Sequence, residues 1–328
     1  MANISILMPV YNVQDYVAEA IESMLHQTYT DFELILLDDC STDKTAEVIK
    51  TIVDSRIVYH CNERNMGLAN NLNVGLKMAS GKYIARMDGD DISLPDRLQI
   101  QVDFLETHPD IDLCSCGMKM FGADNQVWVR DYDPEQVKIT MLFYSAVLHA
   151  SSLFRKASFE KYDLHYNQDT FPAEDYDLWS RAIFYCKMVN LPDVLYLYRM
   201  HHAQVTSTDK RSAEKCREIQ LKYLQQALPE LTQSDVINFV DRFVPEEIKT
   251  LCDVRLFKKA YTQIVKANKT AAFFDQYKLH TTLNKRYQNK VFMFLKTFRI
   301  SSIKDFFTFL TVLFHLRLNQ IVKLILKK

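Results

Sequence analysis

Residues 83–91 read Tyr-Ile-Ala-Arg-Met-Asp-Gly-Asp-Asp, a short apolar run that ends in a turn crowded with carboxylates. The run has the length and apolar character of a buried strand, and the turn follows it directly. Similar runs occur at 4–10, 32–37 and 57–60, and stretches with helical spacing of apolar residues occur at 16–25, 45–52, 68–78 and 95–106. Strands that alternate with helices of about ten residues predict an α/β fold, in which a mostly parallel sheet has helices on both faces.

Polar residues follow each of the four expected strands. In a parallel sheet, ligands bind beyond the carboxyl ends of the strands, so these are the positions to consider first. They are Tyr11-Asn12, Asp38-Asp39, the segment 62–67 and the segment 88–91. One such cluster is typical of an ordinary turn, because Asn, Asp and Gly form turns locally. Four in succession, two of them doubly acidic, favour a functional site at this edge.

The usual glycine-rich phosphate loops are missing from the sequence. Pro9-Val10-Tyr11-Asn12, where a dinucleotide-binding turn would follow the first strand, contains no glycine. The segment 75–83 has five residues between its glycines and a Tyr where a Walker loop has Ser or Thr. A phosphate ligand would therefore need a divalent cation, and the carboxylates at 88–91 could hold Mg²⁺ or Mn²⁺. The residues alone leave a second reading open, an acidic first turn of the helix near Pro95.

The composition indicates a folded chain of about two domains, because 328 residues are 48% hydrophobic and 25% charged. The 40 basic and 41 acidic residues argue against a nucleic-acid partner. Seven scattered cysteines without a C-x-x-C pair are typical of a reducing compartment, which predicts a cytoplasmic protein. We see neither a secretory signal nor an apolar run of about 18 residues that could span a membrane.

The second half of the sequence has a different character. Strand-like runs at 148–154 and 194–198 enclose an acidic helix start at Glu174, and from residue 206 onward the pattern is helical. We place a domain boundary near residue 208. Residues 1–208 are then an α/β catalytic domain, and 209–328 an α-helical domain.

At this point five motifs, taken in order, resemble glycosyltransferase family 2. They are Pro9-Val10-Tyr11-Asn12, Asp38-Asp39-Cys40-Ser41-Thr42-Asp43, Arg64-Asn65-Met66-Gly67, Asp88-Gly89-Asp90-Asp91 and Glu174-Asp175-Tyr176-Asp177-Leu178-Trp179. The resemblance covers about residues 3–205 and implies a GT-A fold and an inverting transfer from a nucleotide-activated sugar. It also implies that about 1–122 bind the nucleotide sugar, and that about 123–208 supply the acceptor side and the base. The main departure is Cys40, where the family often has Gly.

The resemblance assigns a donor pocket to the early motifs. Pro9 and Tyr11 match the wall on which the base stacks, as a planar ring allows. Asp39 matches the residue that accepts a hydrogen bond from a uracil or thymine imide, whereas Asp38 could instead organise the turn. The residues Arg64, Asn65 and Gly67 match donor-pocket positions. From the residues alone, a Tyr that caps the sheet and a polar turn at 64–67 are equally open.

Asp88-Gly89-Asp90 matches the D-x-D element of the family. The resemblance implies that Asp88 meets the ribose or sugar and that Asp90 holds the metal, with Asp91 as a donor-binding neighbour whose role the sequence does not separate. His201, in a Y-R-x-H segment at 198–201, is implied as a second ligand of the metal or the diphosphate. The alternative is a surface pair of His201 and His202.

Glu174 and Asp175 match the catalytic E-D pair of the family, with Asp175 as the general base. Without the resemblance, an acidic first helical turn would be the simpler reading. The implied reaction is a metal-assisted displacement on a nucleotide sugar, with UDP favoured, by a hydroxyl of a glycan or lipid-linked acceptor. The alternatives are a nucleotidyltransferase, and a nucleotide-sugar-binding or membrane-surface adaptor without turnover.

The C-terminal tail is basic and rich in apolar residues. Ten basic residues and one acid occur from residue 285 to the end, a net charge of +9, while the whole chain carries −1. A helix at 300–328 with an apolar face edged by Lys and Arg suits an anionic membrane surface, which predicts a peripheral protein on the inner face of the plasma membrane. The alternative is packing on the helical domain itself or on a second copy of the chain, which would give an oligomer.

Overall fold

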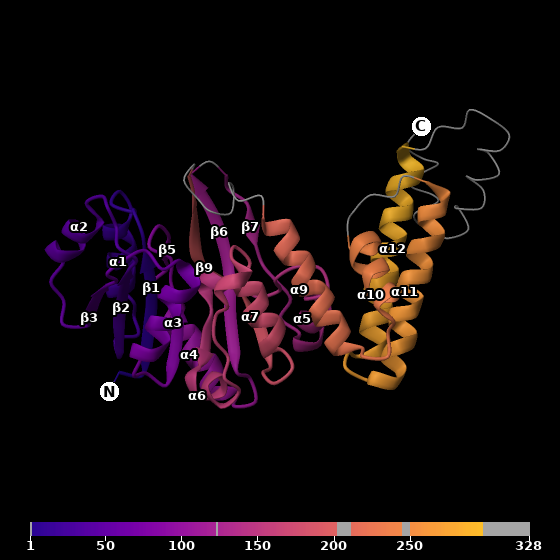
Figure 1. Ribbon diagram of the computed structural model, residues 1–328. Coiled ribbons are helices and arrows are strands. Elements are labelled where there is room, and N and C mark those ends of the chain that lie inside the picture. The colour runs from indigo at the N-terminus through magenta and orange to yellow at the C-terminus, as the bar shows by residue number, and fades with distance from the viewer. Residues whose placement is uncertain (1, 123, 202–210, 245–249, 298–328) are drawn as a thin grey trace. The chain divides into compact units, whose positions relative to one another are not determined.

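The computed structural model describes residues 2–122, 124–201, 211–244 and 250–297 (Figure 1). Internal contacts divide the chain into two compact units, Met1–Cys216 and Arg217–Lys328. The boundary that we predicted near residue 208 falls in 202–210, outside the described residues. The tail at 300–328 also lies outside them.

The first unit is built on one mixed sheet. Within the described residues it has nine strands, in the order β3-β2-β1-β4-β8-β6-β9-β5, with β7 paired to β6. The strands are β1 Ile4–Val10, β2 Phe32–Asp38, β3 Ile57–Cys61, β4 Tyr83–Arg86, β5 Ile92–Ser93, β6 Leu113–Gly122, β7 Val127–Trp128, β8 Leu153–Arg155 and β9 Met188–Met200. The pairs β1–β2, β2–β3, β1–β4 and β6–β9 are parallel, and the pairs that involve β5, β7 or β8 are antiparallel. The mostly parallel sheet predicted from the sequence is confirmed.

Helices accompany the strands as the sequence predicts. They are α1 Val17–Leu25, α2 Thr45–Thr51, α3 Leu68–Met78, α4 Arg97–Thr107, α5 Pro134–Thr140, α6 Lys156–Lys161 and α7 Glu174–Ala182. Their apolar residues recur at helical spacing: Val17, Ala20, Ile21 and Met24 are the buried positions of α1. All seven residues of β1 are buried, as expected for a central strand that is covered on both faces.

The parallel strands bring the early polar motifs together. The carboxyl ends of β1, β2, β3 and β4 share one edge, and backbone hydrogen bonds continue past the strands. Asp39 N donates to Val10 O at 3.0 Å, and Asn62 N donates to Asp38 O at 2.9 Å. The loops at this edge are therefore held as one layer.

Two later strands differ from the prediction. The run 148–154 is a short 3-10 turn, His149–Ser151, followed by β8, and 194–198 lies within the second half of the longer β9. The hydroxyl of Ser152 donates to His149 O at 2.8 Å, and that of Ser151 to Leu148 O at 3.3 Å. These local side-chain bonds compete with strand pairing, and they turn the chain before β8 begins.

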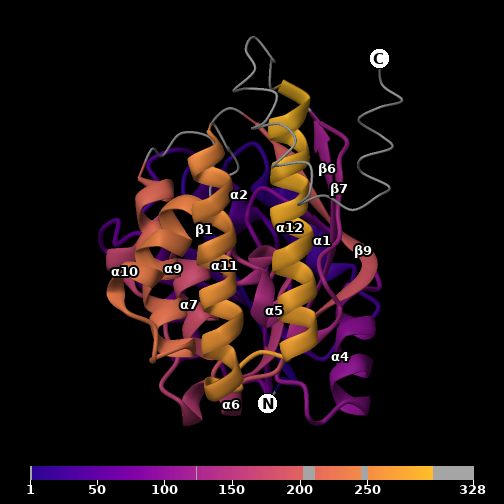
Figure 2. The same cartoon turned by 90° about the vertical axis from the view of Figure 1, so that its right-hand side faces the viewer.

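Within the second unit the described elements are helical, as predicted. They are the larger part of α9 Ser212–Ala227, then α10 Gln233–Asn238, a π-helical turn Phe239–Phe243, α11 Leu251–Ala271 and α12 Gln276–Thr297. Helices α11 and α12 pack side by side (Figures 1 and 2). Thr250 and Asp253 form a capping box at the start of α11, and Ala272 ends it in the left-handed conformation. None of the helices in the described ranges combines the length and apolar character that a membrane crossing requires.

Candidate active site

Tyr11 lies on the rim of the carboxyl edge. Pro9 is buried inside β1, whereas Tyr11 is the first residue beyond the strand and is 46% exposed. Asn12, with a φ of 52°, fixes the turn that presents it. Its side-chain oxygen accepts from Thr42 N at 2.8 Å, and its own amide donates to Ser41 Oγ at 3.1 Å. The ring of Tyr11 is therefore exposed on a turn that is tied to the loop after β2.

Asp38 organises the loop after β2. It is fully buried, and its two oxygens accept from Ser41 N and Tyr59 Oη, each at 2.8 Å. The loop then passes through Cys40, whose φ of 63° lies in the left-handed region that favours glycine. This explains in physical terms why Gly would suit position 40.

Asp39 ties the loop after β3 to the site. Its Oδ1 accepts from Asn62 Nδ2 and Met66 N, both at 2.9 Å, and its Oδ2 accepts from Gly67 N at 2.8 Å. A carboxylate has about four acceptor positions, so one remains for a ligand. Asp39 therefore has a structural task in addition to any contact with a base.

The loop at 62–67 presents polar groups to the same edge. Arg64 and Asn65 are exposed, and the side-chain oxygen of Asn65 accepts from Gly67 N at 3.1 Å. Gly67 has a φ of 82° and precedes α3. That conformation requires glycine, because a side chain in it would be strained.

The three carboxylates of the acidic turn at 88–91 differ in burial and in hydrogen bonding. Asp88 and Asp90 are half-buried, whereas Asp91 is fully buried and accepts from Arg199 N at 2.7 Å through Oδ1. The carboxylate of Asp91 therefore holds the end of β9 from below and does not reach the surface in this conformation. Burial, followed by the charge of Asp88, raises the pKa of Asp90, and burial raises that of Asp91 well above its usual value.

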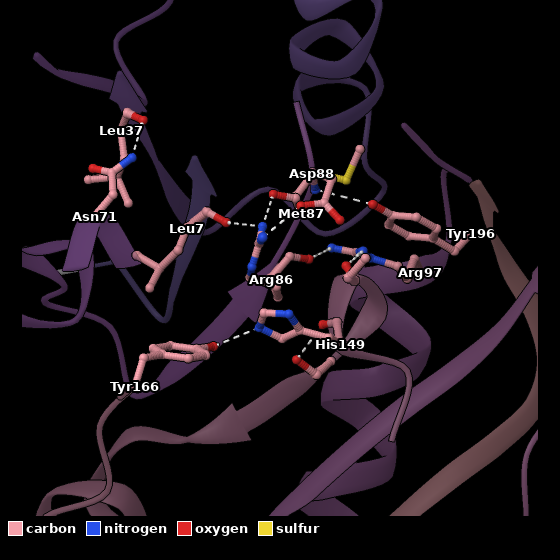
Figure 3. Close-up of polar contacts among 12 residues, drawn as sticks. Leu7, Leu37, Asn71, Arg86, Met87, Asp88, Arg97, His149, Tyr166 and Tyr196 are labelled. Carbon is pink, nitrogen blue, oxygen red and sulfur yellow. Dashed lines mark hydrogen bonds and ion pairs between the residues drawn. The ribbon is translucent and has the colours of Figure 1, made fainter. Parts of the chain in front are cut away.

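Arg86 lies beneath this turn and was not singled out by sequence reasoning. Its guanidinium is fully buried and contacts the carboxylate of Asp88 at 2.6 Å (Figure 3). It also donates to Met87 O and, at 3.5 Å, to Leu7 O. The one available signal was a basic residue inside an otherwise apolar central strand, where an unpaired charge would be costly.

His201 contacts Asp90 at the surface of the site. Its Nε2 lies 2.9 Å from Asp90 Oδ2, and its ring centroid is 4.8 Å from that of Tyr16 in the turn before α1. The neighbouring Arg199 donates to Asp90 O at 2.7 Å and pairs with Glu19 at 2.5 Å. The end of β9 is thus fixed against both the acidic turn and α1.

The Asp90–His201 pair suits a divalent cation that is only partly held by protein. Among the residues that the structure describes, no three His, Cys, Asp or Glu side chains cluster closely enough to form a complete protein cage. Mg²⁺ in nucleotide sites is usually bound by one or two carboxylates together with substrate phosphates. The Asp90–His201 pair offers one carboxylate and one imidazole to such a site. The raised pKa of Asp90 fits it too, because a cation would relieve the crowding of negative charge.

Glu174 and Asp175 begin α7. Asp175 Oδ2 accepts from Ser145 Oγ at 3.1 Å, and burial raises the pKa of Asp175. Burial, followed by the charge of Asp175, raises the pKa of Glu174 to about 7. Glu174 Oε2 is buried and has no hydrogen-bond partner among the described residues. Sequence reasoning could not have found Ser145, because nothing local marks it as a partner of a residue thirty positions later.

His149 and Tyr166 form a hydrogen-bonded pair near Arg86. His149 Nε2 lies 2.8 Å from Tyr166 Oη, and the two rings lie close to Arg86 in Figure 3. Burial, followed by the charge of Arg86, lowers the pKa of His149 well below its usual value, so this imidazole is neutral near pH 7. Arg86 also interacts electrostatically with Glu174 and Asp175, so the structure brings the predicted D-x-D and E-D elements around one buried cation.

Comparisons with known proteins identify the family. The family model described as Glycosyl transferase family 2 matches residues 5–163. The "Putative glycosyltransferase EpsE" of Bacillus subtilis is 36% identical over 201 residues, which are 60% of this chain and 72% of EpsE. An uncharacterized glycosyltransferase of Haemophilus influenzae is 32% identical over 219 residues, 62% of this chain and 67% of that protein.

Two solved structures share the fold. TarS 1-349 of S. aureus in complex with UDP-GlcNAc has a TM-score of 0.60 at 18% identity, covering 88% of this chain and 89% of TarS 1-349. The mannosyltransferase PcManGT of Pyrobaculum calidifontis, in complex with GDP-Man and Mn²⁺, has a TM-score of 0.54 at 15% identity, covering 90% and 87%. Both likenesses support the α/β architecture with a C-terminal helical region.

Proposed function

Because the chain belongs to glycosyltransferase family 2, we propose that it transfers a sugar from a nucleoside diphosphate sugar to a hydroxyl of a glycan or lipid-linked acceptor, with inversion at the anomeric carbon. The observation that carries this proposal is the grouping of Asp88, Glu174 and Asp175 around the buried Arg86. A donor site and a base must lie side by side in a direct displacement, and this grouping supports the proposal because it would supply both.

The donor would bind across the ends of β1, β2 and β3. Tyr11 offers an exposed ring for the base, above the buried Pro9, and Asp39 keeps one acceptor position for an imide N–H. Arg64 and Asn65 lie on the loop that Asp39 holds, and Gly67 lets its backbone turn there. A uracil base fits this acceptor, which favours a UDP sugar.

The leaving diphosphate would lie over the acidic turn. Asp90 and His201 would hold a Mn²⁺ or Mg²⁺ ion, which when bound supplies positive charge to the departing phosphate oxygens. Asp88, oriented by Arg86, would accept from the ribose or the sugar. Asp91 would act from beneath, where it fixes the strand that carries His201.

Asp175 would act as the general base. It takes the proton of the acceptor hydroxyl while that oxygen attacks the anomeric carbon, and the bond from this carbon to the diphosphate oxygen breaks. An α-linked donor would then give a β-linked product. Ser145 donates to Asp175 and orients it, and Glu174 is its neighbour in the first turn of α7.

A donor panel tests this proposal. The protein is incubated with Mn²⁺ or Mg²⁺ and individual nucleotide sugars, and the nucleoside diphosphate released without acceptor is measured. We expect one donor to be hydrolysed in the presence of the metal, and Asp90→Ala to abolish this metal-dependent release. Nucleotide-sugar binding without any release, with and without glycan acceptors, would instead identify an adaptor without turnover.

We also propose that the basic tail at 300–328 places the protein on an anionic membrane. This proposal is supported by the sequence, in which the last 44 residues carry a net charge of +9. Deletion of 300–328 should abolish co-sedimentation with vesicles that contain anionic lipid. Equal sedimentation with neutral vesicles, or none with either, would contradict it.

A further inference from the structure

Exposed aromatic and apolar side chains gather on the acceptor half of the first unit. Val127, Trp128, Val129 and Tyr132 are 38–53% exposed, and Tyr144 is 39% exposed. Most proteins bury such side chains, and a contiguous exposed group of them marks a binding surface. We call Trp128, Arg130 and Tyr144 the aromatic platform.

Arg130 fixes the two rings of the platform. Its guanidinium carbon lies 4.7 Å from the ring centroid of Tyr144 and 5.8 Å from that of Trp128. A cation over a ring face is attracted by the electron density of the ring. Both aromatic residues are therefore held in place, and each still keeps more than a third of its surface exposed.

The backbone beneath the platform is also fixed. The buried Asn190 of β9 donates to Asp131 O at 2.9 Å and to Ala146 O at 3.1 Å, so one side chain joins the two segments that carry the platform. The hydroxyl of Thr140 donates to Asp131 Oδ2 at 2.7 Å. A surface that is rigid before binding loses little entropy when a ligand arrives.

The platform shares a chain segment with a hydrogen-bond partner of the proposed base. Tyr144 directly precedes Ser145, and the hydroxyl of Ser145 donates to Asp175 at 3.1 Å. The start of α7 is tied to the same segment a second time, because Tyr176 Oη donates to Met141 O at 2.5 Å. A ligand on the platform would therefore lie next to the residue that must receive the acceptor proton.

We propose that the aromatic platform is the acceptor subsite, and that it binds a pyranose ring of a glycan acceptor. The C–H face of the sugar would stack on Trp128 and Tyr144, and the N–H groups of Arg130 would donate to its hydroxyls. Rigid aromatic side chains give such contacts at little entropic cost.

This inference rests on the proposed transfer reaction and names its acceptor as a ring sugar. Trp128→Ala and Tyr144→Ala should each raise the KM for a glycan acceptor about fivefold to tenfold, and the KM for the donor should keep its wild-type value. Tyr144→Phe should bind acceptor like the wild type, because it keeps the ring. Tyr277→Ala, at a 78% exposed position of α12, is the matched control and should change neither constant.

The two tryptophans of the chain allow a direct binding test that needs no turnover. Trp128 is 38% exposed and Trp179 is fully buried, so acrylamide quenches mainly Trp128. The probes are methyl β-glucoside, methyl β-galactoside, methyl N-acetyl-β-glucosaminide and cellobiose, at up to about 0.1 M to cover millimolar affinities. We expect at least one of them to protect Trp128, and Tyr144→Ala to remove the protection.

Glycerol phosphate, which has hydroxyls but no ring face, is the contrasting probe. Equal protection by glycerol phosphate, or no protection by any of the four sugars, would overturn the inference. Failure of the proposed function looks different: no nucleotide sugar would be cleaved, whereas Trp128 would still report sugar binding. If donor cleavage occurs and both alanine variants keep the wild-type KM for acceptor, only the platform is wrong.

Discussion

The guanidinium of Arg86 lies 2.6 Å from the carboxylate of Asp88, and the two side chains differ sharply in environment, because Arg86 is 2% exposed and Asp88 is 29% exposed. The buried partner therefore fixes the direction of the more exposed carboxylate. A guanidinium can contact Asp88, Met87 O and Leu7 O at once because its donors form a rigid fork. The D-x-D turn is thus oriented from below by a cation on the strand that precedes it.

Arg86→Lys tests this orientation. An ammonium is a single point charge and cannot reach the carboxylate and both carbonyls together, so a buried acceptor loses its partner. We expect a loss of about 1–3 kcal/mol in the free energy of unfolding, measured with urea, and weaker donor binding by calorimetry.

The control is Lys82→Met in the turn before the same strand. Lys82 pairs with Glu106, but the two side chains are 51% and 47% exposed. An ion pair in that setting contributes about 0–1 kcal/mol. Equal effects of the two substitutions would contradict a special role for Arg86.

The sequence was sufficient for the sheet and for the edge at which the site lies. Apolar periodicity separated strands from helices, and parallel strands necessarily bring Asp39, Gly67 and Asp88 to one side. Asp39 also has a structural role that its motif does not indicate, because it accepts hydrogen bonds from Met66 N and Gly67 N. Asp88 and Asp91 have different partners because their side chains point in different directions. The direction of a side chain in a turn cannot be deduced from the residue types alone.

Two of the missed residues act over long sequence separations. Ser145 reaches Asp175, and Tyr16 reaches His201, through packing of elements whose pairing only the folded chain establishes. Arg86 was hidden for the opposite reason, because it lies inside an apolar run that identifies a strand. A charged residue inside an apolar strand predicts a buried ionic partner, because an unpaired buried charge would be costly.

Cys40 offers a test of backbone strain. Its φ of 63° is left-handed, a conformation that costs an ordinary residue roughly 1–2 kcal/mol. Cys40→Gly should remove this cost but increase the entropy of the unfolded chain, which leaves a net gain of a few tenths to about 1 kcal/mol. Cys61→Gly, at an exposed position of β3, should instead destabilise by about 0.5–1 kcal/mol. Opposite signs in urea unfolding would support the argument, and a loss of stability in both variants would refute it.

Glu174 should make stability depend on pH. Burial and the charge of Asp175 raise its pKa from the ordinary 4.5 to about 7, so the folded chain holds a proton that the unfolded chain has lost. The contribution of Glu174 to the free energy of unfolding is then fully present below about pH 4.5. It falls by up to about 3 kcal/mol as the pH rises to 7. Glu174→Gln removes this fall, whereas Glu160→Gln, at a 65% exposed side chain, keeps it. Urea unfolding between pH 5 and pH 8 measures the slopes, and parallel curves for Glu174→Gln and the wild type would disprove the assignment.

If Asp175 is the general base that we propose, Asp175 and Ser145 should together set the pH dependence of turnover. Asp175→Asn removes the base and should lower kcat by about 10²–10⁴, with donor affinity retained, whereas Asp163→Asn, at a 97% exposed side chain, should have no effect. Burial raises the pKa of Asp175 and the hydrogen bond from Ser145 lowers it, so Ser145→Ala should raise it further. A base works only when deprotonated, and turnover rises with pH through this pKa. Ser145→Ala should therefore move the acidic limb of the kcat profile to higher pH and leave turnover above the limb close to that of the wild type. A limb that stays in place while kcat falls equally at every pH would mean that Ser145 supports the fold of the loop and does not tune the base.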